Sequence, residues 1–403
     1  MPAPVPRTVD DALRRIAATE PRLHAWTHLD PHAASAARTA PDGPLHALPF
    51  GVKDIYDVAG LPTECGSPLR EGRVAERDSA LVARLREAGA VPLGKTVTTE
   101  FAYFAPGPTR NPHGPEHTPG GSSSGSAAAV AAGHVPFALG SQTAGSLTRP
   151  TAYCGTAGYV PPVGAWPTDG IQGLSPTLDA PGLLAPDVDA LLPLVEALDG
   201  TRPEGEPELG IWQATELADV DPEMTAVLTA TAERLGAEAT PVRGLDTGYL
   251  AELHACVMAY EAARSLATEA RTPHALSAPL RELLTRGAAT PEGDYRLALD
   301  TRADLRSRAL ARLDSTVVLA PAAPGAAPRG LAATGSPVLS RPWQFLGLPT
   351  ITVPGHRDRN GMPLGLQLIG HPGQLPALFA AARRVRTATR ALTGTTPRPE
   401  TTA

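Results

Sequence analysis

Small residues dominate the segment GGSSSGSAAAVAAG at positions 120–133, and this segment limits the possible folds more than any other. A flexible glycine–serine linker would not continue directly into an apolar stretch such as AAAVAA. We therefore expect a loop that leads into a buried, alanine-rich helix. The small side chains of such a helix allow neighbouring elements to approach it closely.

On both sides of this segment, predicted strands alternate with predicted helices. A buried strand is expected within 48–58, a helix from Ser79 onward and a strand at 90–95, which is a strand–helix–strand order. Further helices are expected over 10–18, 187–198, 222–235, 247–271, 302–313 and 375–389, and further strands near 135–140, 315–321, 350–354 and 363–370. This alternation predicts an α/β fold with a mostly covered sheet.

Composition narrows the class of protein. The chain has 35 Lys and Arg against 41 Asp and Glu, and this net charge of -6 gives no reason to expect a nucleic acid or an anionic membrane as partner. The N-terminus contains no apolar signal-peptide core, and no window of about 18 apolar residues predicts a membrane span. Three separated cysteines, Cys65, Cys154 and Cys256, predict neither a disulfide framework nor a structural zinc site. We therefore expect a reduced, cytoplasmic protein.

Only two of the 35 basic residues are lysines, Lys53 and Lys95. A chain with this bias uses arginine wherever a surface cation suffices, so the two lysines are expected where arginine would not work. A desolvated lysine can lose its proton and act as a base, whereas arginine stays protonated. Lys53, on a predicted buried strand, is therefore a candidate general base.

Two serine-rich loops, 121–125 and 141–146, allow three interpretations. The sequence GSSSG matches a nucleophile elbow centred on Ser123, but that motif requires a preceding strand, and the residues before it are irregular. Glycine and serine loops can also be purely structural turns. In the third interpretation, a neutral lysine accepts a proton from a serine, directly or through a second hydroxyl. The backbone N–H groups of the second loop would then face a developing oxyanion.

Seven motifs make the chain resemble the amidase signature hydrolases, in the order that this family has and over nearly the whole sequence. They are GVKD (51–54), TRNP (109–112), GGSSSGSAAAVAAG (120–133), GSQTAGSLTRPTAYCG (140–155), LDAPG (178–182), GLPTITVP (347–354) and PLGLQLIG (363–370). The resemblance implies a single α/β/α domain over residues 1–392, built on a large mixed β-sheet that helices cover. The tail, 393–403, is expected to be flexible.

By position, the resemblance implies a Ser–cis-Ser–Lys triad. Ser146 matches the nucleophile, Ser122 the relay serine with its cis peptide bond, and Lys53 the base. The oxyanion loop is matched by Thr143, Ala144 and Gly145. Ala144 stands where the family usually has glycine, although some relatives share this alanine. Gln142 stands where many relatives have aspartate, and a subgroup has glutamine.

Other residues are candidates for substrate binding or for structure. In the GGS-x-x-RP subgroup, which is malonamidase-like, an arginine at the position of Arg149 can bind a substrate carboxylate, and a structural ion pair is the alternative. Tyr103 and Phe104 are candidates for the wall of the acyl pocket, and Gly121 is a further substrate-binding candidate. Lys95 lies in a GKT sequence that the family has outside the triad, and it is expected to stabilise the structure.

The activity implied by the resemblance is hydrolysis of a small carboxamide, with or without a carboxylate, to an acid and ammonia or an amine. The reaction would proceed through an acyl-Ser146 intermediate without a metal or cofactor. Two alternatives stay open: transfer of the acyl group or of ammonia to an acceptor, as in amidotransferases, and a catalytically inactive binding subunit. The expected partner is a small amide, neither nucleic acid nor membrane is expected, and a homodimer is allowed.

Overall fold

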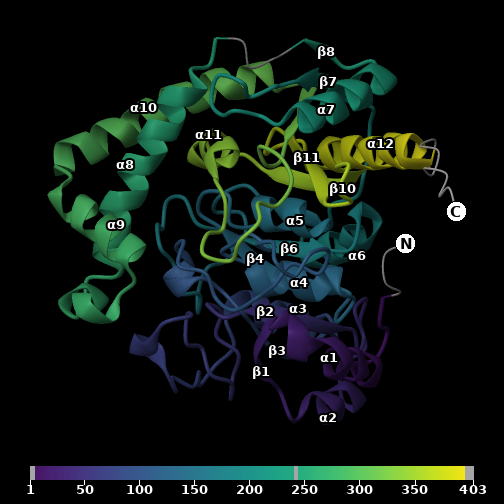
Figure 1. The fold of residues 1–403 in the computed structure, drawn as a ribbon, viewed down its shortest axis with the longest axis vertical. Helices are drawn as coiled ribbons and strands as arrows, with labels where there is room; N and C mark the ends of the chain where they lie inside the picture. The colour runs from purple at the N-terminus through teal and green to yellow at the C-terminus, as the bar shows by residue number, and fades with distance from the viewer. Residues whose placement is uncertain (1–4, 240–243, 395–403) are drawn as a thin grey trace, which may run out of the picture.

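One mixed β-sheet organises the structure (Figure 1). The computed structural model describes residues 5–239 and 244–394, and within them the sheet has eleven strands in the order β1-β3-β2-β4-β6-β5-β10-β11-β9-β7-β8. The strands are β1 (Trp26–Leu29), β2 (Pro49–Lys53), β3 (Val91–Thr96), β4 (Phe137–Gln142), β5 (Ala157–Val160), β6 (Ala180–Ala185), β7 (Glu208–Ile211), β8 (Glu238–Ala239), β9 (Thr316–Pro321), β10 (Thr350–Arg357) and β11 (Pro363–Ile369). Neighbours pair in parallel in β3–β2–β4 and in β9–β7–β8, and antiparallel elsewhere.

Helices pack against both faces of the sheet. The α-helices of the described residues are α1 (Val9–Leu23), α2 (Ala33–Arg38), α3 (Ala80–Glu87), α4 (Ser124–Ala131), α5 (Thr148–Cys154), α6 (Val188–Asp199), α7 (Pro222–Leu235), α8 (Thr247–Ser265), α9 (Ala278–Ala289), α10 (Glu292–Arg312), α11 (Arg341–Phe345) and α12 (Leu375–Gly394), and of these α8, α9 and α10 pack mainly on one another. Along β4, Phe137 and Leu139 belong to one apolar cluster and Ala138 to another, as the alternation of side chains in a strand requires. The predicted α/β fold with a large mixed sheet covered by helices is confirmed.

The small-residue segment forms the loop and buried helix that the sequence predicts. Helix α4 is buried from Ser124 to Val130. A Cβ atom on Gly125 would lie 2.3 Å from the carbonyl oxygen of Ala25 and 2.4 Å from the amide nitrogen of Val97. Only glycine permits this approach, and it brings the serine loop before α4 against the end of β3.

Helices α8, α9 and α10 pack on one another along the left side of Figure 1. Here three sequence predictions need correction. The helix predicted over 247–271 ends at Ser265, and Glu269–Arg271 form a separate 3₁₀ turn ahead of Pro273. The helix predicted over 302–313 begins at Glu292, and α9 was not predicted. Helix α10 buries only Ala298 and Ala309, so its apolar periodicity is too weak to mark its start.

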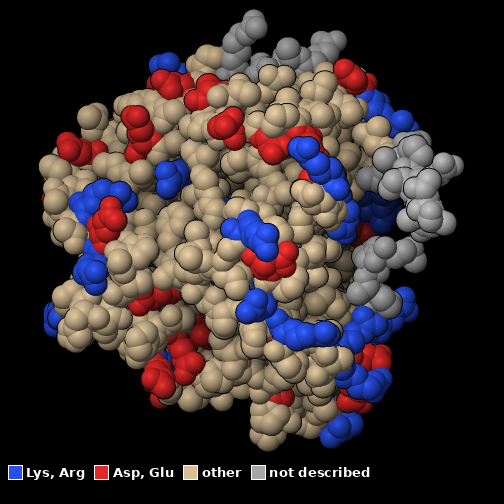
Figure 2. Space-filling model, viewed as in Figure 1, with Lys and Arg blue, Asp and Glu red and all other residues tan. Residues whose placement is uncertain are grey.

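The C-terminal boundary also differs from the prediction. Helix α12 continues to Gly394, so the predicted domain end at residue 392 falls inside a helix. The rest of the predicted tail, 395–403, lies outside the described residues. No helix in the described ranges is both long enough and apolar enough to cross a membrane. On the face drawn in Figure 2, basic and acidic side chains lie interspersed among uncharged ones.

Candidate active site

Lys53 is the last residue of β2, a strand whose five residues are all buried. Its side chain is 0% exposed, and its Nζ atom lies 2.7 Å from both the Ser122 Oγ and the Ser141 Oγ. No carboxylate forms an ion pair with Lys53 in the described part of the chain. Burial removes water from the ammonium group and lowers the pKa of Lys53 to about 7, although the negative charge of Asp179 acts in the opposite direction. This lysine can therefore lose its proton near neutral pH.

Ser122 and Ser146 come from two different loops that meet beside this lysine. The peptide bond between Gly121 and Ser122 is cis, as the resemblance implies. Ser146 lies between β4 and α5, and the N–H group of Ser123 donates to its carbonyl oxygen over 3.1 Å. Both hydroxyl groups line the same pocket, and no hydrogen bond joins them in the described ranges. The structure thus brings the three predicted triad residues together at one end of the central strands.

The loop predicted to form the oxyanion hole is held from two sides. The Oγ1 atom of Thr143 donates to the carboxylate of Asp179, which also accepts the N–H groups of Leu174 and Ser175 at 2.8 and 2.9 Å. On the other side, the Nε2 atom of His254, in α8, donates to the carbonyl oxygen of Thr143 over 2.7 Å. Burial raises the pKa of Asp179 to about 6 and lowers that of His254 to about 3. The histidine is therefore neutral at ordinary pH.

The two departures from the family pattern near this loop have structural explanations. Ala144 is not among the residues with positive φ, so its Cβ atom imposes no backbone strain there. The Oε1 atom of Gln142 accepts the N–H groups of Leu147 and Thr148 at 3.2 and 3.0 Å, where α5 begins. Its Nε2 atom donates to the side-chain oxygen of Gln344 over 3.1 Å. The side-chain oxygen of Gln142 thus accepts hydrogen bonds from the first N–H groups of α5, as an aspartate carboxylate could. The amide nitrogen of Gln142 adds a hydrogen-bond donor that aspartate lacks.

A small pocket opens over Ser122 and Ser146, with an empty volume of about 340 Å³. Tyr103 and Phe104 both line this pocket, and their rings pack edge to face with centroids 4.8 Å apart. Gly121 does not line the pocket. Its carbonyl oxygen accepts a 2.6 Å hydrogen bond from an arginine side chain that lines the pocket. Gly121 thus contacts the pocket through this arginine.

The arginine is Arg149, which is 3% exposed and reaches the pocket from α5. Its Nη2 atom donates to Gly121 and, over 3.2 Å, to the hydroxyl of Thr334. Its Nε and Nη1 atoms are buried without a hydrogen-bond partner, and no carboxylate pairs with the guanidinium in the described ranges. The structural ion pair that the sequence left as an alternative is therefore not formed. Burial lowers the pKa of Arg149 to about 10, which still leaves the group charged at neutral pH.

A second cavity, with an empty volume of about 840 Å³, adjoins the small pocket. The two share Ala102, Thr143 and Leu174, and the second also reaches Ser141 and Asp179. The space beside the lysine and its serine partners is therefore larger than the small pocket alone.

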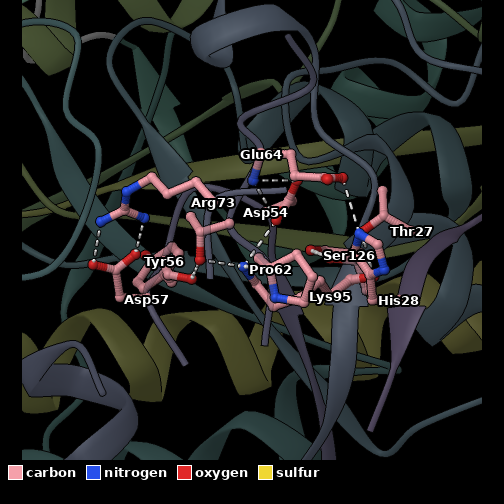
Figure 3. Close-up of polar contacts among 12 residues, drawn as sticks. Thr27, His28, Asp54, Tyr56, Asp57, Pro62, Glu64, Arg73, Lys95 and Ser126 are labelled. Atoms are coloured by element: carbon pink, nitrogen blue, oxygen red, sulfur yellow. Dashed lines mark hydrogen bonds and ion pairs between the residues drawn. The ribbon is translucent and has the colours of Figure 1, made fainter. Parts of the chain in front are cut away.

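Lys95 lies apart from these residues, in the polar cluster drawn in Figure 3. Its Nζ atom is 2.8 Å from the Asp54 carboxylate and donates to the carbonyl oxygen of Pro62 and the hydroxyl of Thr63, both at 2.9 Å. Both members of the ion pair are almost fully buried. This arrangement agrees with the structural role predicted for Lys95.

Sequence reasoning did not find several residues at the site. Ser141 and Asp179 lie inside family motifs, in 140–155 and 178–182. Membership of these motifs was the only feature of the sequence that could have identified them. His254 and Met258 of α8 and Arg341 of α11 lie outside every motif, and the last two line the pocket. Within the described residues, no three His, Cys, Asp or Glu side chains are grouped so that they could hold a metal ion.

Comparisons with known proteins identify the family of the chain. A family model described as Amidase matches residues 7–378. The chain is 32% identical to a glutamyl-tRNA(Gln) amidotransferase subunit of Synechococcus sp. (strain WH7803), over 93% of this chain and 92% of that protein. A crystal structure of an amidase superimposes with a TM-score of 0.83 at 31% identity, covering 94% of this chain and 95% of the other.

A further solved relative is the native peptide amidase from Stenotrophomonas maltophilia. It has a TM-score of 0.79 and 28% identity, and the match covers 95% of this chain and 93% of that enzyme. The family model, the relatives and the fold all agree over most of the sequence. The chain therefore belongs to the amidase signature family of enzymes.

Proposed function

We propose that this protein is an amidase that hydrolyses a small carboxamide to a carboxylic acid and ammonia or an amine. The observation that carries the proposal is the contact of Lys53 with Ser122 beside Ser146. A lysine with a pKa of about 7 is a suitable base for a serine hydroxyl at neutral pH.

In the proposed reaction, the neutral amine of Lys53 takes the proton of Ser122, which takes the proton of Ser146. The Ser146 oxygen attacks the amide carbonyl carbon, and a carbon–oxygen bond forms. Backbone N–H groups of the loop 143–146 stabilise the resulting oxyanion. The carbon–nitrogen bond then breaks as the proton returns through Ser122 to the leaving nitrogen. Water, activated by the same pair, cleaves the acyl ester and restores Ser146.

Ser141 and Asp179 support this machinery without taking part in the bonds that change. Ser141 fixes the position of the Lys53 amine through a 2.7 Å contact. Asp179 fixes Thr143 and therefore the direction of the oxyanion loop. A loop that is held in place before the substrate binds does not need to reorganise during the reaction. Its N–H groups can therefore stabilise the oxyanion without a reorganisation cost.

We propose further that the substrate carries a carboxylate, which Arg149 binds. A buried guanidinium with two free donor atoms is costly unless an anion balances it, and a carboxylate matches its fork. Arg149 lines the same pocket as Ser122 and Ser146, so a carboxylate bound to it would lie close to the scissile amide, which favours a short substrate. These features support a small amide-acid, as in the malonamidase-like subgroup.

A second candidate function is the transfer of the acyl group or of ammonia. It is favoured by the relative named as a glutamyl-tRNA(Gln) amidotransferase subunit, which matches over 93% of this chain. A protein of this kind requires partner proteins, so purification of the tagged chain at its native level tests it. Stoichiometric co-purifying proteins and an ammonia yield that depends on them would favour transfer.

The test of the amidase proposal combines labelling with product analysis. A fluorophosphonate should label the wild-type chain on Ser146 and should not label the Ser146→Ala variant. Ammonia release is then measured with pairs of short amides that differ only in a terminal carboxylate. Hydrolysis that disappears in Ser146→Ala supports the proposal. Absence of labelling in the wild type would favour the inactive binding protein.

A further inference from the structure

Two arginines, not one, face the small pocket over Ser122 and Ser146. Arg149 extends from α5, and Arg341 is the first residue of α11. The other lining residues are apolar, aromatic or hydroxyl-bearing, and none of them is acidic. The pocket therefore holds two positive charges and no negative charge of its own.

The donors of both arginines are incompletely used. The Nε atom of Arg341 is buried without a hydrogen-bond partner, as are the Nε and Nη1 atoms of Arg149. Arg341 forms no ion pair with a carboxylate anywhere in the described ranges. Burial lowers the pKa of Arg341, and the positive charge of Arg286 lowers it further, whereas Tyr103 acts in the opposite direction. Burial also lowers the pKa of Arg149, and the charge of Arg341 adds to this effect.

Two guanidinium groups that face one small pocket repel each other, and burial removes water from each of them. Both costs fall when one anion lies between them. A carboxylate has two oxygens and about four lone-pair sites, so it can accept from two guanidinium groups at once. Because Nη2 of Arg149 is engaged by Gly121 and Thr334, its Nε and Nη1 atoms are the ones left for a ligand.

We propose that Arg341 and Arg149 together bind the single carboxylate of the substrate, so that Arg341 is a second specificity-determining residue. This inference rests on the proposed amidase function and adds a residue that no sequence motif contains. It defines the substrate class as short amides whose carboxylate lies at the end remote from the scissile bond. Arg341 does not take part in the bonds that change.

The first experiment measures protection of Ser146. Wild-type protein is labelled with a fluorophosphonate in the presence of acetate, propionate or butyrate, and the concentration that halves the labelling rate is determined. In Arg341→Met this concentration should rise by about 10- to 100-fold, as expected for lost hydrogen bonds to a charged group. Arg341→Lys should give a smaller rise, since it keeps the charge and loses the fork. The exposed Arg308→Met is the matched control and should not change it.

The second experiment asks whether the two arginines act on one carboxylate. In Arg341→Met, kcat/KM should fall more for an amide-acid than for the neutral amide of the same length. If both arginines hold the same group, the loss in the Arg149→Met/Arg341→Met double variant should be smaller than the product of the single losses. If the loss of kcat/KM in the double variant equals the product of the two single losses, the arginines bind two separate anions. This result would overturn the proposal that they share one carboxylate.

The outcomes separate this inference from the function on which it rests. Failure of the wild-type protein to react with the fluorophosphonate would contradict the amidase proposal. Normal labelling of Arg341→Met and of Arg341→Lys, with protection constants equal to those of the wild type, would overturn the role of Arg341 alone. Labelling at the normal rate also shows that each variant is folded at the site.

Discussion

The Nε2 atom of His254 donates a 2.7 Å hydrogen bond to the carbonyl oxygen of Thr143. The histidine is fully buried in α8, and its Nδ1 atom has no hydrogen-bond partner. Because burial lowers the pKa of His254 to about 3, the ring is neutral and its proton is on Nε2. The bond connects α8 to the loop that we propose as the oxyanion hole.

We therefore expect His254→Leu to lower kcat by about 10- to 100-fold with a small change in KM, because small displacements of groups that act in the transition state have effects of this size. His254→Gln should retain most of the activity, since its amide nitrogen can donate from nearly the same place. Steady-state kinetics of both variants, with thermal unfolding as a control, test this. Equal losses in the two variants would mean that the imidazole has a different role.

Lys53 predicts the pH dependence of the reaction. Its pKa of about 7 means that the reactive amine replaces the ammonium as the pH rises through that value. We expect kcat/KM to rise with pH below about 7 and to level off above it. Lys53→Arg should be as inactive as Lys53→Met, because arginine cannot give up its proton at these pH values. Substantial activity in Lys53→Arg would require a different base.

The same lysine predicts how stability depends on pH. Its pKa is about 7 in the folded chain and 10.5 as a free group, so the unfolded chain binds more protons between these values. The contribution of Lys53 to the free energy of unfolding therefore rises with pH in this window, by up to about 1.4 kcal/mol per pH unit. Urea unfolding of the wild type and Lys53→Met at pH 7, 8 and 9 measures the difference. If the free energies of unfolding of the two proteins change with pH in parallel, the pKa of Lys53 is not lowered in the folded chain.

The second lysine should act on stability rather than on chemistry. Removing one member of a buried ion pair leaves the other unpaired, and Lys95→Met should lower the free energy of unfolding by about 3–5 kcal/mol. In the Lys95→Met/Asp54→Asn double variant, the loss should be smaller than the sum of the two single losses. Chemical unfolding of the wild type, the two single variants and the double variant measures these losses. Additive losses would show that the pair does not interact energetically.

Gly125 and Gly293 form a matched pair of helical glycines. A Cβ atom on Gly125 would collide with backbone atoms of Ala25 and Val97, whereas nothing lies within 4 Å of one on Gly293. Gly125→Ala should therefore destabilise the protein by about 1–3 kcal/mol or more. Gly293→Ala should stabilise it by about 0.4–1 kcal/mol. Thermal unfolding measures both, and a neutral Gly125→Ala would mean that the surrounding backbone can move.

The sequence predicted best those parts of the site that lie in continuous motifs. Lys53, Ser122 and Ser146 could be proposed because each lies within a motif of the family, and the helices at 10–18 and 222–235 were expected from local sequence patterns. These features depend on neighbours in the sequence, so a short window contains the information.

What the sequence did not predict depends on contacts between distant segments. His254 and Thr143 are 111 positions apart, and nothing near either residue indicates the other. Arg341 begins a five-residue helix that lies in no motif. The start of α10 was missed because its surface is polar on nearly every side, so that tertiary packing rather than periodicity defines it.

Helix α8 connects the width of the pocket to the position of the loop at Thr143, and this connection limits how the substrate range could change. Met258 lines the pocket over Ser122 and Ser146, and His254, four residues earlier and on the same face of the helix, is hydrogen-bonded to Thr143 in the proposed oxyanion loop. A larger residue at position 258 that pushed the helix outward would also draw Thr143 away from the reacting carbonyl. Selection for bulkier substrates through this helix is therefore expected to lower turnover.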